Sequence, residues 1–279
     1  MREFATAAEL LDAVREEGVL VYGTGFVARS LLAALDAHGL SERVEGFVVS
    51  SPQEPGATHA GLPLVGVDAL AADEPRLICV AVHESVLPEI AAALEERGIS
   101  NATWVYPHLQ RLIYGEPLRR GQRVRVADIL AAQDPRYRWI AVRALAAMEH
   151  AGTSKHGYDV YLKAQSLHCS PATARMRLER FKTLMESVAA HGIDSRYPLL
   201  CDENLQVIDG LHRLSLCWLE GVCEVSCDIV AASESYGRLI DDRNRLTPAV
   251  LDDAGLTAEE RAELEGVQAR LWESCTDRG

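Results

Sequence analysis

The sequence predicts an α/β protein built from two domains. At 279 residues the chain exceeds the usual size of one domain. In its first half, short apolar runs alternate with amphipathic helical stretches, a pattern typical of a parallel sheet covered on both faces. Two turns that contain glycine, VYGTG and VIDGLHR, each join a strand-like run to a helix-like one. Such turns mark the places where an α/β fold most often binds a ligand.

The first domain is expected over residues 1–117. From residue 19 the chain reads VLVYGTGFVARSLLAALDAHG, which predicts a buried strand, a glycine turn and an amphipathic helix that ends at a glycine. Two more buried strands are indicated by VEGFVVS and LICVAV, and a second helix by PEIAAALEERG. The boundary is placed near Pro117, after WVYPHLQRLIYGE.

The first glycine turn matches a relaxed dinucleotide fingerprint at Gly23, Gly25 and Ala28. The acidic residue expected at the end of the next strand is replaced by Ser50 and Ser51, which departs from the NAD pattern. The domain resembles the N-terminal domains of PglD-type sugar acyltransferases and related CoA-binding-like domains. That resemblance implies a Rossmann-like fold that binds a nucleotide, a nucleotide-sugar or a similar phosphorylated ligand at Gly23 and Gly25. A degenerate domain that binds nothing and serves for assembly is the alternative.

Residues 118–150 are expected to form a helical connector. It contains an arginine-rich stretch from Arg119 to Arg143, which indicates either a partner surface or a solvated helix face. Trp139 and Ile140 are apolar residues on this connector. We expect them either to support a homodimer or to pack between the domains.

The second domain is expected over residues 151–232, followed by a helical tail over 233–279. A long helix with apolar residues at helical spacing ends near ESVAAHG, and the strands YPLLC and LQVI follow it. The turn DGLHR, the helix LSLCWLEG and the strand CEVSCDIV come next. Thr257 and Glu260 predict a capping box at the start of the tail helix.

The turn DGLHR brings four chemically useful residues within five positions. Gly210 permits a backbone conformation that other residues resist, and the N–H groups of the following helix can bind an anion. Arg213 adds a fork of donors suited to phosphate. His212 can donate to the phosphate or transfer a proton, and Asp209 can hold Mg²⁺ or orient a hydroxyl. Each residue alone has an ordinary structural role, but together they predict a phosphate site.

Residues 172–230 resemble the ParB/sulfiredoxin fold, and the turn is nearest to the DGHHR motif of the free serine kinases. This resemblance implies an α+β domain that binds ATP or another nucleoside phosphate with Mg²⁺. Gly210, His212 and Arg213 would hold the phosphates, with Asp209 and His212 as catalytic groups and Asp209 as the metal ligand. Leu211 stands where sulfiredoxins need a cysteine, which argues against reduction of sulfinic acids.

The catalytic glutamate of the serine kinases has no counterpart at the comparable place in this sequence. The comparable stretch, SPATARMR, contains no carboxylate, and Glu179 lies one or two turns too late in the helix. Asp209, or a carboxylate from elsewhere, would have to replace it. The sequence therefore predicts a nucleotide-dependent phosphotransferase that acts on a hydroxyl of a small molecule, an amino acid or a sugar derivative, in surface-glycan or secondary-metabolite assembly. A non-catalytic nucleotide-binding regulatory or scaffold protein is the alternative.

Composition argues against several other classes of protein. The net charge of −13 disfavours broad attraction to nucleic acid or to anionic membranes. No apolar run approaches the ~20 residues that span a bilayer, so a soluble, cytoplasmic protein is expected. Only about 50 residues, rich in Asp and Glu, follow the ParB-like region, which disfavours sequence-specific DNA binding. The chain has 7 cysteines, and Cys217, Cys223 and Cys227 lack the spacing of a zinc site. We expect them to be buried, reduced thiols.

Overall fold

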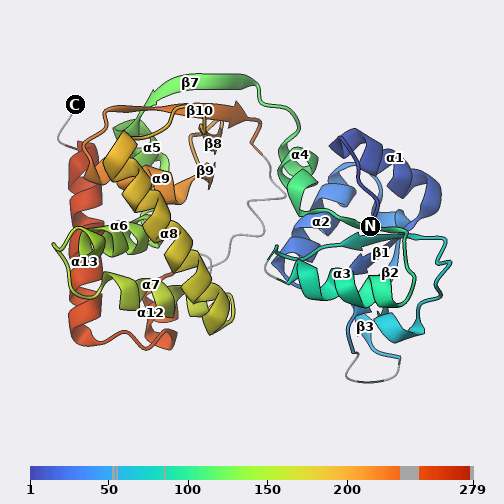
Figure 1. Cartoon of the computed structure of the whole chain (residues 1–279). Coiled ribbons are helices and arrows are strands. Elements are labelled where there is room, and N and C mark those ends of the chain that lie inside the picture. The colour runs from blue at the N-terminus through green and yellow to red at the C-terminus, as the bar shows by residue number, and fades with distance from the viewer. Residues whose placement is uncertain (52–53, 55, 85, 233–244, 277–279) are drawn as a thin grey trace. The chain divides into compact units, whose positions relative to one another are not determined.

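The computed structural model describes residues 1–276 apart from 52–53, 55, 85 and 233–244. The chain divides into two units, one formed by Met1–Glu116 and the other beginning at Pro117 (Figure 1). Each unit contains one sheet with helices packed on it. The α/β class predicted from the sequence is therefore confirmed.

A six-stranded sheet with the order β3-β4-β2-β1-β5-β6 forms the centre of the first unit. Every neighbouring pair is parallel except β3 with β4. The strands are β1 (Val19–Tyr22), β2 (Val44–Val49), β3 (Thr58–His59), β4 (Leu62–Gly66), β5 (Leu77–Val80) and β6 (Ala102–Trp104).

Helices cover this sheet on both faces. Because side chains alternate along a strand, Val19 and Val21 of β1 belong to one hydrophobic core, and Leu20 and Tyr22 belong to another. The first core includes residues of α1, α2 and α4, and the second includes residues of α3. These helices are α1 (Ala7–Glu17), α2 (Phe26–Ala37), α3 (Leu87–Glu96) and α4 (Leu109–Tyr114), with short 3-10 turns at η1 (Ser41–Arg43), η2 (Val67–Ala69) and η3 (Tyr106–His108).

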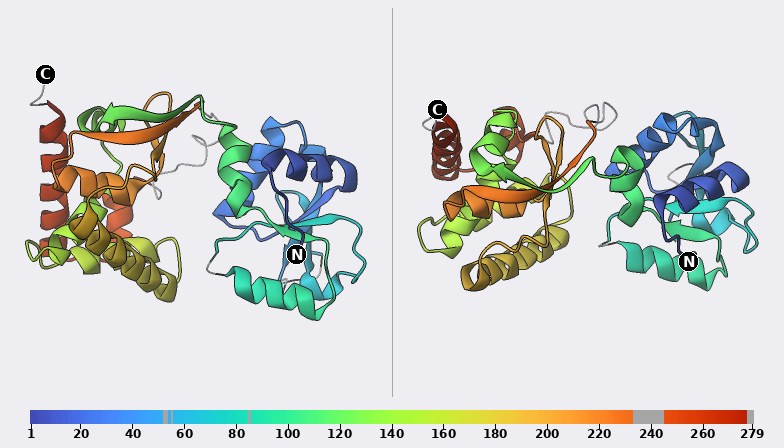
Figure 2. Two further views of the ribbon diagram at one scale, coloured as in Figure 1. Left: turned by 45° about the horizontal axis from the view of Figure 1, so that its top comes forward. Right: turned by 90° about the horizontal axis from the view of Figure 1, so that it is seen from above.

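The second unit is built on a mixed sheet with the order β7-β10-β8-β9. β10 pairs antiparallel with β7 and parallel with β8, and β8 pairs antiparallel with β9. The strands are β7 (Arg119–Arg125), β8 (Leu199–Asp202), β9 (Val207–Asp209) and β10 (Glu224–Val230). Within this unit, helices α6 to α9 gather beneath the long β7–β10 pair, as both Figure 1 and Figure 2 show.

Helix α6 lies at the centre of this second unit. Nine of its residues are buried, Arg143 among them, which is the pattern of a helix enclosed by other elements. Its neighbours in the core are largely helical. The helices of the unit are α5 (Val126–Ala132), α6 (Trp139–His150), α7 (Gly157–Ser166), α8 (Pro171–His191), α9 (Leu211–Leu219), α12 (Pro248–Asp253) and α13 (Ala258–Thr276).

The stretch 118–150, expected as a helical connector, lies inside the second unit instead. Residues 119–125 form strand β7, in which Val124 is the one buried residue. Because β7 is an edge strand with polar exposed positions, it lacks the apolar alternation that would have predicted it. Trp139 and Ile140 are buried in the core of this unit, so neither is available for a dimer contact or for packing between domains.

The cysteine prediction is confirmed at two positions and wrong at one. Cys217 and Cys227 are buried, and burial raises the pKa of the Cys217 thiol to about 11, which makes it a poor nucleophile at neutral pH. Cys223 is exposed, because β10 begins at Glu224 and Cys223 therefore lies in the preceding turn.

The capping box predicted for the tail helix is confirmed. The Thr257 amide donates to Glu260 Oε2 at 2.6 Å, and the Glu260 amide donates to Thr257 Oγ1 at 3.2 Å. Glu260 also accepts from Lys163 Nζ at 2.7 Å, which ties α13 to α7. Residues 233–244 of the expected tail lie outside the described residues.

The close approach of α7 to α6 supplies a first prediction, the replacement Gly157→Ala. A Cβ atom at Gly157 would lie 2.7 Å from Ala146 Cα, inside van der Waals contact with the backbone of α6. We expect a loss of stability on the order of 1–3 kcal/mol, because the helices must separate. Urea unfolding of the purified variant measures it.

Gly266→Ala is the matched control for this substitution. Gly266 lies within α13, and a Cβ there meets nothing within 4 Å. That variant should gain about 0.4–1 kcal/mol, because alanine restricts the unfolded chain. Equal stability changes in the two variants would contradict the close crossing of α6 and α7.

Candidate functional site

The turn at residues 209–213 joins edge strand β9 to helix α9. Gly210 has φ of +101°, a left-handed conformation that favours glycine. A Cβ at this position would also lie only 2.5 Å from Leu199 Cδ2. The backbone conformation therefore favours glycine here, and the end of the Leu199 side chain would have to move to admit a Cβ.

The first amides of α9 have no partner within the helix. The first backbone hydrogen bond of the helix runs from the Leu214 amide to the Gly210 carbonyl at 2.9 Å, so the amides of residues 211–213 precede the helical ladder. No side chain caps this end of α9. Asp209, which could have served as a cap, has a side chain that is 61% exposed. Such uncapped helix N-termini are places where proteins commonly bind phosphate groups.

Arg213 is largely engaged by the protein itself. Its Nη1 donates to the carbonyls of Tyr197 and of Pro198, the latter at 2.9 Å, and its Nη2 lies 3.4 Å from Asp209 Oδ2. The guanidinium therefore fastens the turn to the segment before β8. Direct contact between Arg213 and a phosphate stays a prediction.

His212 lies among aromatic side chains and is neutral at neutral pH. Its Nε2 is 3.0 Å from the Tyr161 hydroxyl, and its ring packs edge-to-face on Phe181 with ring centroids 4.5 Å apart. Desolvation lowers the pKa of His212 well below its usual range, and repulsion from Arg143, Arg177 and Arg213 lowers it further. A neutral ring can exchange a proton or hydrogen-bond a ligand, but it adds no positive charge.

Two of the arginines that act on His212 were not assigned to the site by the sequence. Arg177, on α8, donates from Nη1 to Gln165 Oε1 at 2.8 Å. Arg143, on α6, had been placed only in the arginine-rich stretch. The sequence could have pointed to Arg143 because it is the one cation within the apolar run WIAVRALAAM. A lone cation on a buried helix face is a residue that needs an explanation.

The structure places Glu179 and the candidate metal ligand Asp209 in solvent-exposed positions. Glu179 has a side chain that is 69% exposed, and it pairs with Lys182 at 2.8 Å on the surface of α8, so it does not replace the missing glutamate. The described residues also contain no cluster of three or more side chains that would hold a metal ion. Mg²⁺ at Asp209 would therefore have to be completed by phosphate oxygens and water, as Mg²⁺ often is.

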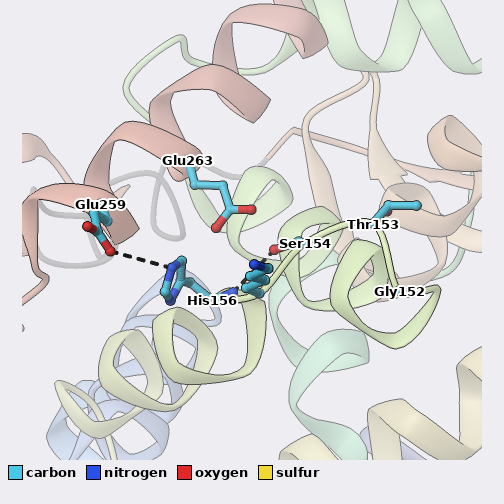
Figure 3. A pocket seen from close by; sticks show the side chains of 7 residues that line it. Gly152, Thr153, Ser154, His156, Glu259 and Glu263 are labelled. Carbon is cyan, nitrogen blue, oxygen red and sulfur yellow. Dashed lines mark hydrogen bonds and ion pairs between the residues drawn. The ribbon is translucent and has the colours of Figure 1, made fainter.

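An open pocket of about 540 Å³ lies elsewhere in the second unit (Figure 3). It is formed by the turn between α6 and α7 together with the start of α13, and none of its lining residues belongs to the DGLHR turn. His156 Nε2 and Glu259 Oε2 lie 3.9 Å apart in it, and Lys155 and Glu263 add one charge of each sign. This mixture selects for neither anions nor cations.

The first glycine turn lies at the carboxyl end of β1, next to the point where the strand order reverses. β2 and β5 flank β1, and the chain moves outward to β4 on one side and to β6 on the other. Gly23 has φ of +109°, and its amide donates to the Val48 carbonyl at 2.9 Å. Gly25 is the N-cap of α2, and a Cβ there would meet nothing within 4 Å. Open α/β sheets commonly bind ligands at such a point.

Comparison with known proteins gives no match. No family model matches the sequence, and no curated protein or solved structure is significantly similar to it. Among the described residues, no helix has both the length and the apolar character needed to cross a membrane.

The depressed pKa of His212 predicts how stability depends on pH. Below about pH 6.5, His212 binds a proton in the unfolded chain but stays neutral in the folded protein. The free energy of unfolding therefore falls as the pH falls, by up to about 1.4 kcal/mol per pH unit from this group. His212→Gln keeps a polar group beside Tyr161 but does not titrate. Urea unfolding between pH 7.5 and 5 should show a smaller loss of stability in the variant than in the wild type. Parallel curves would mean that His212 protonates equally in both states.

Proposed function

We propose that the second unit binds the phosphates of a nucleotide, such as ATP with Mg²⁺, at the turn of residues 209–213. The observation that carries this proposal is the uncapped N-terminus of α9 after left-handed Gly210. The charge balance supports it, because three arginines act on His212, and within the described chain Asp209 is the one carboxylate of the turn. An anion is the ligand that such a field favours.

The fold arrangement is compatible with both resemblances named above. In the second unit the order α8, β8, β9, turn, α9, β10 agrees with a ParB/sulfiredoxin-like domain. In the first unit the parallel sheet and the glycine turn beside its reversal point agree with a Rossmann-like domain. A second phosphorylated ligand at Gly23 and Gly25 is part of the same proposal.

Binding without chemistry is the function that this geometry supports best. The second candidate, phosphoryl transfer to a hydroxyl of a small molecule, is favoured by the exposed carboxylate of Asp209 at the edge of the turn. Asp209 would accept the hydroxyl proton while the oxygen attacks the terminal phosphorus. The bond to the bridging oxygen would then break, and the nucleoside diphosphate would leave with the electron pair.

Thermal unfolding with a panel of ATP, ADP, CTP, NAD, CoA and UDP-sugars, each with Mg²⁺, tests the binding proposal. At a hundredfold excess over its Kd, a ligand of the second unit should raise the melting temperature by about 5–10 °C. Arg213→Ala should abolish the increase, because the turn loses its anchor to Tyr197 and Pro198.

Arg196→Ala is the matched control, since Arg196 is an exposed arginine whose side chain pairs with nearby Asp194. It should keep the nucleotide response. A response that survives in Arg213→Ala would remove the ligand from this turn and direct attention to Gly23 and Gly25. A panel without any response would refute the binding proposal.

Phosphoryl transfer is tested separately with Asp209→Asn. We expect this variant to bind the nucleotide but to lose transfer to hydroxyl acceptors, because the amide cannot accept the proton. ³¹P NMR of reactions with a panel of hydroxy amino acids and sugars measures the transfer. Transfer at the wild-type rate in Asp209→Asn would exclude Asp209 as the base.

A further inference from the structure

Arg143 is a buried cation that forms no ion pair within the described part of the chain. Only 9% of the residue is exposed, and burial lowers the pKa of its guanidinium. Its Nη1 donates to the Trp139 carbonyl one turn earlier at 3.0 Å, and the group lies over the Trp139 ring at 4.8 Å from the centroid. Its Nε is buried and has no hydrogen-bond partner within the described structure. Leaving a buried charged donor unsatisfied is costly, so a ligand that supplied an acceptor to Nε would stabilise the folded protein.

Arg138, near the start of the same helix, shows how the fold treats an arginine with a structural role. Its side chain is also largely buried, and it pairs through Nε with Glu265 of α13 at 2.9 Å. The chain therefore supplies a carboxylate to Arg138 and none, among the described residues, to Arg143.

A second guanidinium approaches the same group of side chains from α8. Arg177 is held by the neutral amide of Gln165, so its charge is not cancelled either. Both Arg143 and Arg177 act electrostatically on the Tyr161 hydroxyl and on His212, which are hydrogen-bonded to each other. The two arginines and this pair come from α6, α7, α8 and α9, four different helices.

The charge of this group of side chains is positive, whereas the whole chain has a net charge of −13. Asp209 is a carboxylate that acts on Arg143, but its side chain is 61% exposed and lies mostly in solvent. A guanidinium presents a planar set of donors that matches the oxygens of phosphate or carboxylate. A bound anion would satisfy the orphaned donor and offset the buried charge.

We infer that Arg143 and Arg177 form a second anion subsite beside the turn, which binds a compact phosphate or carboxylate group with the Tyr161 hydroxyl as a further donor. The subsite rests on the two arginines alone. That this subsite binds an anionic group next to a nucleotide held at the turn of residues 209–213 rests on the proposed function.

The test uses Arg143→Met, which replaces the buried charge with an apolar side chain. Without an anion, this variant should melt no lower than the wild type, because exchanging an unpaired buried cation for an apolar group is neutral or stabilising. Inorganic phosphate or malonate, titrated at constant ionic strength, should raise the melting temperature of the wild type. Affinity measured by calorimetry should fall roughly 10- to 100-fold in the variant.

Arg138→Met is the matched control. It should melt lower than the wild type without any anion, because Glu265 loses its partner, and it should keep the full anion response. Arg177→Gln removes the second charge from a more exposed position and should weaken the anion response in the same direction as Arg143→Met. A preference for phosphate over malonate assigns the subsite to a phosphate group, and the reverse preference assigns it to a carboxylate.

The inference is overturned if Arg143→Met melts lower without an anion, as Arg138→Met does, or if it keeps the anion response. It is also overturned if the wild type responds to neither anion. The two proposals fail separately. If a nucleotide raises the melting temperature in Arg143→Met but not in Arg213→Ala, nucleotide binding at the turn is supported and the subsite is not. If phosphate raises the melting temperature only when Arg143 is present, and no nucleotide raises it, the subsite is supported and nucleotide binding at the turn is not.

Discussion

The second unit depends on the burial of helix α6 on all its sides. The close approach of α7 at Gly157 requires a residue without a side chain, because the backbone of Leu145 and Ala146 occupies that space. On another side the Ser215 hydroxyl of α9 bridges the carbonyls of Ile140 and of Leu211, at 3.2 and 2.7 Å. Helix α9 is thereby held against α6 by a polar contact as well as by apolar packing. The contact with α6 thereby helps to position the N-terminus of α9 and the turn of residues 209–213 that precedes it.

This packing explains how charged and polar groups come to lie inside the unit. A helix enclosed by others carries any polar residue of its buried face into the interior, and α6 does so with Arg143. The cost of burying that charge must be offset by hydrogen bonds or by an opposite charge. Tyr161, His212 and Phe181 pack their rings together in this unit, and electrostatic interactions are stronger in such a desolvated environment than in water. The neutral state of His212 is one consequence.

The predictions from sequence succeeded where local pattern and tertiary environment agree. Strands β1 and β5 are continuous apolar runs because both faces of their sheet are covered, and Gly210 adopts the left-handed conformation that its place before a helix suggested. They failed where the environment overrides the pattern. Strand β7 is polar because it lies at a sheet edge, and the apolar residues Trp139 and Ile140 face an interior that the sequence does not reveal.

By itself, the sequence determined the α/β class, the open turn at residues 209–213 and the glycine turn at Gly23, since these follow from local periodicity and from the conformational freedom of glycine. Only the tertiary structure decided which other groups act on the turn. Arg143 and Arg177 precede His212 by 69 and 35 positions in the chain, as their numbers in the sequence show. Their effect on the imidazole arises because charges in a desolvated interior interact through space with little screening, whatever their separation in sequence.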